Sequence, residues 1–202
     1  MKETSDILPQ AVLFNSEQIQ YYQNKLLRLQ NFDEAFELVK KAVDAKFKMH
    51  RAGLSLVLQG LPTKLGAYHV LGSNIIIINR RILDIIKTRR SLEEYNSYLF
   101  MVLAHEYLHS FGIVDEFQVR QMTYDLCSSL LGKEHPASIM AKEDPSALLP
   151  ELTLLRETRF DKHFEIVKEI LTKKVSIISS NITCSTCKYF GIISAQTIIQ
   201  QP

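Results

Sequence analysis

One segment of this chain constrains the fold more than any other, because a fully apolar run passes directly into polar, chemically active side chains. Every residue from 99 to 104 is apolar, and His105, Glu106 and His109 follow at once. A helix that is apolar on every side belongs in a protein core. We therefore expect a buried helix whose C-terminal end carries a polar cluster.

Capping signals and changes in hydrophobic period predict the elements around this helix. Ser91 and Glu94 have the spacing of a capping box, and Gly112 is suited to end the helix that they begin. Asp115 can cap the following helix, which Gly132 closes. Apolar residues at three- and four-residue steps predict helices, and short β-branched runs predict strands. The other expected helices are 16–30, 31–50 (closed by Gly53), 115–131 and 161–173, the expected strands are 54–59, 66–71 and 74–79, and residues 135–150 are expected to be irregular.

These elements indicate an α+β fold in which the three strands form a small antiparallel meander, although a mixed sheet is also compatible with them. With 202 residues, of which 46% are hydrophobic, the chain can form one domain with extensions. We place an N-terminal helical extension at 1–30, the main domain at 31–150, and a C-terminal extension at 151–202. The last of these is expected to contain a helix and the pair Cys184 and Cys187.

The polar cluster has the spacing of a metal site. His105 and His109 are four residues apart, so a helix places both imidazoles on one face, where they can share an ion. Glu106 projects beside that ion without having to bind it. Zinc with an open position lowers the pKa of a water, and a neighbouring carboxylate can act as general base. The pattern therefore predicts Zn²⁺ as cofactor and Glu106 as the catalytic residue.

The segment His105-Glu106-Tyr107-Leu108-His109, together with the strand pair expected at 66–79, resembles the zincin metallopeptidases. The resemblance covers roughly residues 31–140. It implies a backing helix, a small sheet, an active-site helix and a following helix that supplies the third ligand. It also implies hydrolysis of peptide bonds.

Two neighbouring residues compete for the role of third ligand. Asp115 has the spacing of the metzincin branch, and Ser138-Ile139-Met140 is similar to the methionine turn of that branch. Glu116 opens the next helix and looks like the ligand of the gluzincin branch. Because Asp115 also serves as a helix cap, we prefer Glu116 and keep Asp115 as the alternative.

Several other polar side chains are candidates for smaller roles. His135 can stabilise an oxyanion or bind metal, and Tyr107 or Tyr124 can polarise a carbonyl group, although packing explains both tyrosines equally well. Arg120, one helical turn after Glu116, can pair with it. Cys184 and Cys187 have a metal or redox spacing, whereas Cys127 is expected in the core.

The preferred function is that of a zinc metallopeptidase whose peptide or protein substrate lies extended along an edge of the sheet. The net charge of +2 favours neither nucleic acid nor a membrane surface, and no long apolar run or leader is expected. Three cysteines favour a reducing, cytoplasmic setting. The alternatives are a metal-dependent hydrolase of another substrate, such as RNA, and a non-catalytic regulatory protein that retains the zincin fold. The oligomeric state stays open. A further hypothesis is that the tail covers the site.

Overall fold

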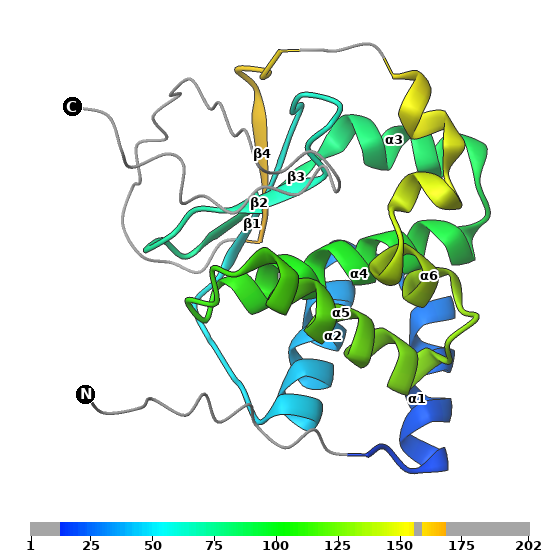
Figure 1. The fold of residues 1–202 in the computed structure, drawn as a ribbon. Helices are drawn as coiled ribbons and strands as arrows, with labels where there is room; N and C mark the ends of the chain where they lie inside the picture. The colour runs from blue at the N-terminus through cyan, green and yellow to red at the C-terminus, as the bar shows by residue number, and fades with distance from the viewer. Residues whose placement is uncertain (1–12, 156–158, 169–202) are drawn as a thin grey trace.

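Helices and a small sheet form separate layers of the molecule (Figure 1). The computed structural model describes residues 13–155 and 159–168. Within these ranges the fold is α+β, as expected, and the sheet is mixed. The helices are α1 (Ser16–Leu27), α2 (Phe32–Phe47), α3 (Arg80–Arg89), α4 (Leu92–His109), α5 (Glu116–Leu131) and α6 (Pro136–Lys142), with short 3-10 helices η1 (Pro145–Ala147) and η2 (Pro150–Leu154). The strands are β1 (Ser55–Gln59), β2 (Ala67–His69), β3 (Ile75–Asn79) and β4 (Phe164–Lys168).

The strand order is β2-β3-β1-β4, so the expected antiparallel meander is wrong. Strands β1 and β3 pair in parallel, while β2 joins β3 and β4 joins β1 in antiparallel pairs. The buried amide of Asn79 holds the loop after β1, because it donates to the carbonyls of Leu61, Pro62 and Leu65 at 3.3, 3.1 and 2.8 Å. The loop is thereby folded back on the end of β3, and β2 lies beyond β3 rather than beside β1.

The two central strands are buried on both faces, as the run of isoleucines predicted. The face toward the helices contributes Leu56, Leu58, Ile76 and Ile78 to the main core. The opposite face forms a smaller apolar cluster with Val57, Leu61, Leu65, Tyr68 and Ile77. The strands are therefore fixed in register by apolar contacts on both sides.

Helix α4 lies at the centre of the helical layer and contacts α1, α2, α3, α5, α6 and strand β2. Residues 99–104 are buried at every position, which confirms the expectation from the sequence. The capping box is also confirmed, because Ser91 and Glu94 exchange hydrogen bonds between side chain and backbone at 3.0 and 3.2 Å. Helix α1 contributes Tyr22 and Leu26 to the same core, so the expected N-terminal extension is packed on α4 in its described part.

Helix α2 ends earlier than the sequence indicated. It stops at Phe47, and Lys48 takes a left-handed conformation with φ 57°. Gly53, expected to end this helix, instead has φ 82° in the turn that leads into β1. Left-handed backbone favours glycine, so Gly53 was a correct turn signal assigned to the wrong element.

Two helices were not expected. Helix α3 follows β3 without a loop, because the side chain of Asn79 caps it by accepting from Arg81 N at 3.1 Å. Helix α6 occupies part of the segment expected to be irregular, and its side chains Ala137, Met140 and Ala141 are buried in the core. Asn79 is thus both the last residue of β3 and the N-cap of α3, and the spacing of hydrophobic residues alone does not reveal this double role.

The helix expected at 161–173 is wrong in its described part, where β4 is found. Just before the strand, Asp161 N donates to Gly60 O at 2.7 Å and Gln59 Nε2 donates to Asp161 O at 2.7 Å. Pairing with β1 satisfies backbone groups that a bare sheet edge leaves open. Residues 169–173, Cys184 and Cys187 lie outside the described residues. No helix in the described ranges combines the length and apolar character needed to span a bilayer.

Candidate metal centre

The turn between α4 and α5 brings the end of one helix next to the start of the other. Helix α4 ends at His109, and Gly112 reverses the chain with φ 85°. Nothing lies within 4 Å of a Cβ built on Gly112, so its conformation rather than crowding requires glycine there. Asp115 then caps α5 by accepting from Gln118 N at 3.0 Å. As a result Glu116, the first residue of α5, faces the last turns of α4.

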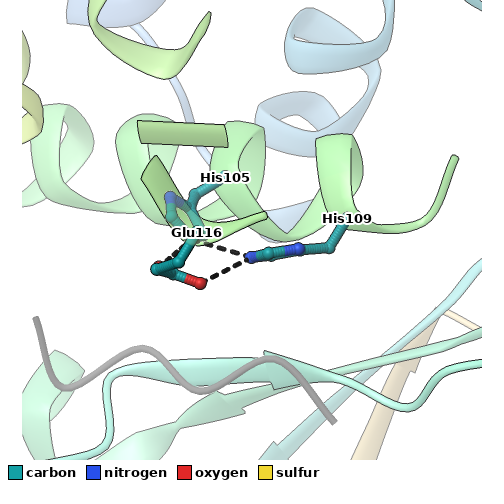
Figure 2. A group of neighbouring side chains, drawn as sticks. All are labelled: His105, His109 and Glu116. Atoms are coloured by element: carbon teal, nitrogen blue, oxygen red, sulfur yellow. Dashed lines mark hydrogen bonds and ion pairs between the residues drawn. The ribbon is translucent and has the colours of Figure 1, made fainter. Parts of the chain in front are cut away.

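The side chains of His105, His109 and Glu116 converge on one point (Figure 2). The Nε2 atoms of the two histidines are 3.1 Å apart. Glu116 Oε1 lies 2.9 Å from His105 Nε2, and Glu116 Oε2 lies 3.1 Å from His109 Nε2. Both imidazoles are buried, whereas the Glu116 side chain is 32% exposed. Among residues 13–155 and 159–168, this is the group of His, Cys, Asp and Glu side chains close enough to share an ion.

A count of protons shows that the contact between His109 and Glu116 needs either an added proton or a metal ion. His109 Nδ1 lies 2.7 Å from Ile113 O, and because a carbonyl only accepts, Nδ1 must carry the proton. In the neutral imidazole of His109 the Nε2 atom then carries a lone pair. This lone pair faces Glu116 Oε2 and His105 Nε2. Lone pairs at this distance repel one another unless a proton or a metal ion lies among them. The hydrogen bond to Ile113 also fixes the ring orientation, as outer-shell partners of metal ligands do.

The pKa values of the three ligand side chains are shifted in different directions. Burial works to raise the pKa of Glu116, but the hydrogen bonds with His105 and His109 outweigh it and lower the pKa to about 2. Burial lowers the pKa of His105. Burial also opposes protonation of His109, yet the hydrogen bond with Glu116 and the charge of Glu106 raise its pKa overall. The cluster therefore contains an ionised carboxylate that draws positive charge toward the imidazoles.

Glu106 is the least satisfied polar group of the region. It is 0% exposed, and neither carboxylate oxygen has a hydrogen-bond partner within the described part of the chain. Burial raises the pKa of Glu106 to about 8, with the nearby charge of His109 and the backbone amide of His69 opposing that rise. That amide faces the carboxylate outside ordinary hydrogen-bond geometry. A buried carboxyl group without partners costs several kcal/mol by order of magnitude, so its position needs a reason beyond packing.

The donor set and its spacing fit zinc. Catalytic zinc sites commonly use two histidines and one carboxylate. Tetrahedral ligands at the usual zinc distances lie about 3.3 Å from one another. The two imidazole Nε2 atoms are 3.1 Å apart, and each lies 2.9 or 3.1 Å from a different oxygen of Glu116. One ligand atom from each residue lies within 4.8 Å of the others, so a modest shift of the side chains would admit the ion. The alternative ligand Asp115 is absent from this group and acts as the cap of α5.

His69 is the site residue that sequence reasoning missed. It lies in β2, is buried, and has its Nδ1 atom 2.9 Å from Ile75 O. Burial lowers the pKa of His69 to about 4, and the charges of Arg51 and His109 add to that effect. A single histidine in a strand pattern carries no signal of its own, because its approach to the cluster depends on how the sheet packs against α4.

The remaining candidates lie elsewhere or have other partners. His135 caps α6 by accepting from Ala137 N at 3.2 Å, and its Nε2 atom is 3.9 Å from Glu93 at the opposite end of α4. Twelve residues of helix, about 18 Å, separate that end from His105. Arg120 donates to the carbonyls of Lys142 and Glu143 at 3.0 and 2.6 Å, and its charge also interacts with that of Glu116.

Four further side chains are explained by packing. Met140 lies within α6 and the core, so the methionine turn expected as an alternative is wrong. Tyr124 packs at the margin of the core. Cys127 is buried, as expected, and burial raises the pKa of its thiol to about 12. The fourth, Tyr107, is buried and hydrogen-bonded to the backbone of Arg51.

Comparison of the chain with protein-family models, with curated proteins and with solved structures finds no match in any of the three.

Proposed function

We propose that this protein is a zinc-dependent metallopeptidase of the zincin kind, with His105, His109 and Glu116 as metal ligands and Glu106 as general base. The observation that carries the proposal is the arrangement of charges at the end of α4. One ligand atom from each of three residues lies within 4.8 Å of the others. A fully buried carboxyl group without a described hydrogen-bond partner lies next in sequence to one of these residues. A structural role explains neither feature.

Each residue of the cluster has a defined task in this proposal. When bound, zinc supplies a Lewis acid that lowers the pKa of a water to near neutrality. His109 is held for binding by the hydrogen bond from Nδ1 to Ile113 O, which leaves Nε2 as the donor to the ion. Glu106 accepts the proton that the attacking water loses and returns it to the leaving amine. Burial raises the pKa of Glu106 to about 8, so the group can take up and release a proton near neutral pH.

The proposed substrate is a peptide or an unfolded protein segment. Strand β2 is an outer strand of the sheet in the described part of the chain, hydrogen-bonded to β3 on one side, and it packs against α4. An extended peptide can add to such an edge through its backbone. The His69 amide in β2 acts on Glu106, so a peptide on this edge would pass close to the base. The net charge of +2 gives no comparable support for an RNA substrate. A reducing, cytoplasmic location belongs to the proposal as well.

The test is cleavage of an unfolded protein by the zinc-loaded enzyme and by Glu106→Gln. The variant should keep its zinc and lose activity by about two to four orders of magnitude, because the general base is removed. Glu93→Gln is the matched control, since it makes the same substitution at an exposed position on the same helix. Activity equal to wild type in Glu106→Gln would remove Glu106 from the mechanism.

A protein that binds zinc but cleaves no peptide would point to the other two functions considered. Hydrolysis of RNA with the same dependence on Glu106 would identify a different substrate. Absence of turnover on both substrates, with zinc bound, would identify a regulatory protein.

A further inference from the structure

Arg51 lies in the short connection between α2 and β1, next to the metal-binding end of α4. Its backbone is anchored on both sides of the peptide unit by the buried side chain of Tyr107. Tyr107 Oη accepts from Arg51 N at 2.8 Å and donates to Arg51 O at 3.2 Å. Tyr107 lies between Glu106 and His109 on α4, so the position of Arg51 is tied directly to the helix that carries the site.

The guanidinium group of Arg51 joins two parts of the molecule that share no strand or helix. On one side it donates to the carbonyl oxygen of Ser110, the residue after His109. On the other side one terminal nitrogen donates to Ser73 O at 3.0 Å and to Asn74 Oδ1 at 2.8 Å. Only a planar group with several fixed donors can satisfy all three oxygens at once.

The residues on the second side belong to the loop between β2 and β3, which is itself well braced. Ser73 Oγ donates to Val70 O at 2.6 Å and accepts from Ile75 N at 3.1 Å. The imidazole of His69, the last residue of β2, donates to Ile75 O at 2.9 Å. Because the loop is stiff, a bond to its tip also sets the position of β2. Arg51 therefore connects the metal helix to the edge strand as one unit.

We propose that Arg51 is a positioning residue, which sets the separation between the ligands on α4 and the edge strand β2, and so places the scissile bond against the metal. This inference rests on the proposed peptidase function. It assigns a specific task to a residue that forms no described hydrogen bond or ion pair with the ligand cluster or with Glu106. Misplacement of a bound substrate by about 1 Å can cost roughly 100-fold in rate. We call the three hydrogen bonds of the Arg51 guanidinium the clamp. Loss of the clamp should lower kcat more than it raises KM, since the edge strand that binds the peptide remains.

The experiment compares zinc-loaded wild type, Arg51→Ala, Arg51→Lys and Asn74→Ala on one unfolded protein substrate. Arg51→Ala should lower kcat by about 100-fold, with KM and zinc affinity within about threefold of wild type. Arg51→Lys should recover part of the loss, because an ammonium group can reach only some of the three oxygens. Asn74→Ala removes one bond on the exposed side of the loop and should lower kcat by about five- to tenfold. Arg80→Ala is the control, as Arg80 also joins distant segments, through Glu165, but contacts neither α4 nor the loop in the described part.

Hydrogen exchange separates failure of the clamp from failure of the proposed function. Amides in 70–75 and 110–113 should exchange faster in Arg51→Ala and Asn74→Ala, while those of α1 stay unchanged. Unchanged exchange in both segments overturns the clamp, whether or not the protein is a peptidase. Faster exchange with a wild-type kcat in a zinc-loaded variant overturns the positioning role. If Arg51→Ala does not fold, Asn74→Ala and Arg51→Lys decide the matter by the same two measurements.

Discussion

The two ends of helix α4 both hold charged clusters, and the difference between them separates what stabilises the fold from what the chain leaves incomplete. At the N-terminal end, Arg90 forms two hydrogen bonds with Glu151 at 2.7 and 2.6 Å and one with Glu94 at 3.3 Å. Glu94 also closes the capping box with Ser91. Every charge there has an opposite partner supplied by the chain itself.

At the C-terminal end, the neutral side chains do not supply a proton for every contact. Glu116 lies against two imidazole nitrogens, one of which must be a lone pair in the neutral ring, and Glu106 has no hydrogen-bond partner in the described residues. The same helix thus carries one cluster that is complete and one that gains most from an added cation. A buried polar group that the chain does not satisfy is a marker of function, because selection for stability alone would remove it.

The largest contrast between the two ends should appear in zinc affinity. His109→Ala, and likewise His105→Ala and Glu116→Ala, should weaken zinc binding by more than about 100-fold, since outer-shell partners alone account for 10- to 100-fold. Glu151→Ala at the other end should leave zinc affinity unchanged. Isothermal titration of each variant with zinc measures the effect. Wild-type affinity in His109→Ala would show that the cluster is not the metal site.

A smaller contrast is expected in the free energy of unfolding of the metal-free protein. Glu94→Gln should destabilise it by about 1 kcal/mol, because the substitution weakens a helix cap. Asp115→Ala should have a cost of similar size for the same reason, and little effect on zinc. Glu106→Gln should leave stability nearly unchanged, since burial raises the pKa of Glu106 to about 8 and a mostly neutral carboxyl group is exchanged for a neutral amide. Urea unfolding measures all three, and a larger loss in Glu106→Gln than in Glu94→Gln would contradict the comparison.

The smallest effect concerns pH and belongs to the N-terminal end. The hydrogen bond with Arg90 lowers the pKa of Glu151 below its ordinary value. Its stabilising contribution is therefore present above the ordinary glutamate pKa and is lost as the pH falls through the lower folded value. We expect the urea midpoint of the wild type to fall more steeply than that of Glu151→Gln between about pH 5 and pH 3, where glutamate titrates. Parallel curves would show that this pair contributes nothing.

The sequence predicted what depends on neighbours along the chain. Three features of α4 follow from residues within about two helical turns of one another. They are its burial, its capping box and the shared face of His105 and His109. The preference for Glu116 over Asp115 rested on the same local logic, because one residue caps α5 and the next faces back toward α4.

What the sequence did not predict depends on contacts between distant segments. Asn79 holds the loop after β1 through bonds to residues more than ten positions away, and the same side chain caps α3. Residues 164–168 become a strand because β1 offers them an edge, which no pattern within those residues records. Nothing in the sequence around Arg51 marks it as a structural residue. Its three acceptors come together only because the end of α4 packs near the β2–β3 loop.

The central claim is that one zinc ion is bound by His105, His109 and Glu116, and a zinc titration of the metal-free protein tests it most directly. The full chain and its Cys184→Ser, Cys187→Ser variant should each bind about one zinc per chain with the same affinity, because the ligands are those at the end of α4. The double variant His105→Ala, His109→Ala should bind none. Zinc bound to that double variant, or lost from the cysteine variant, would place the metal elsewhere and contradict the account.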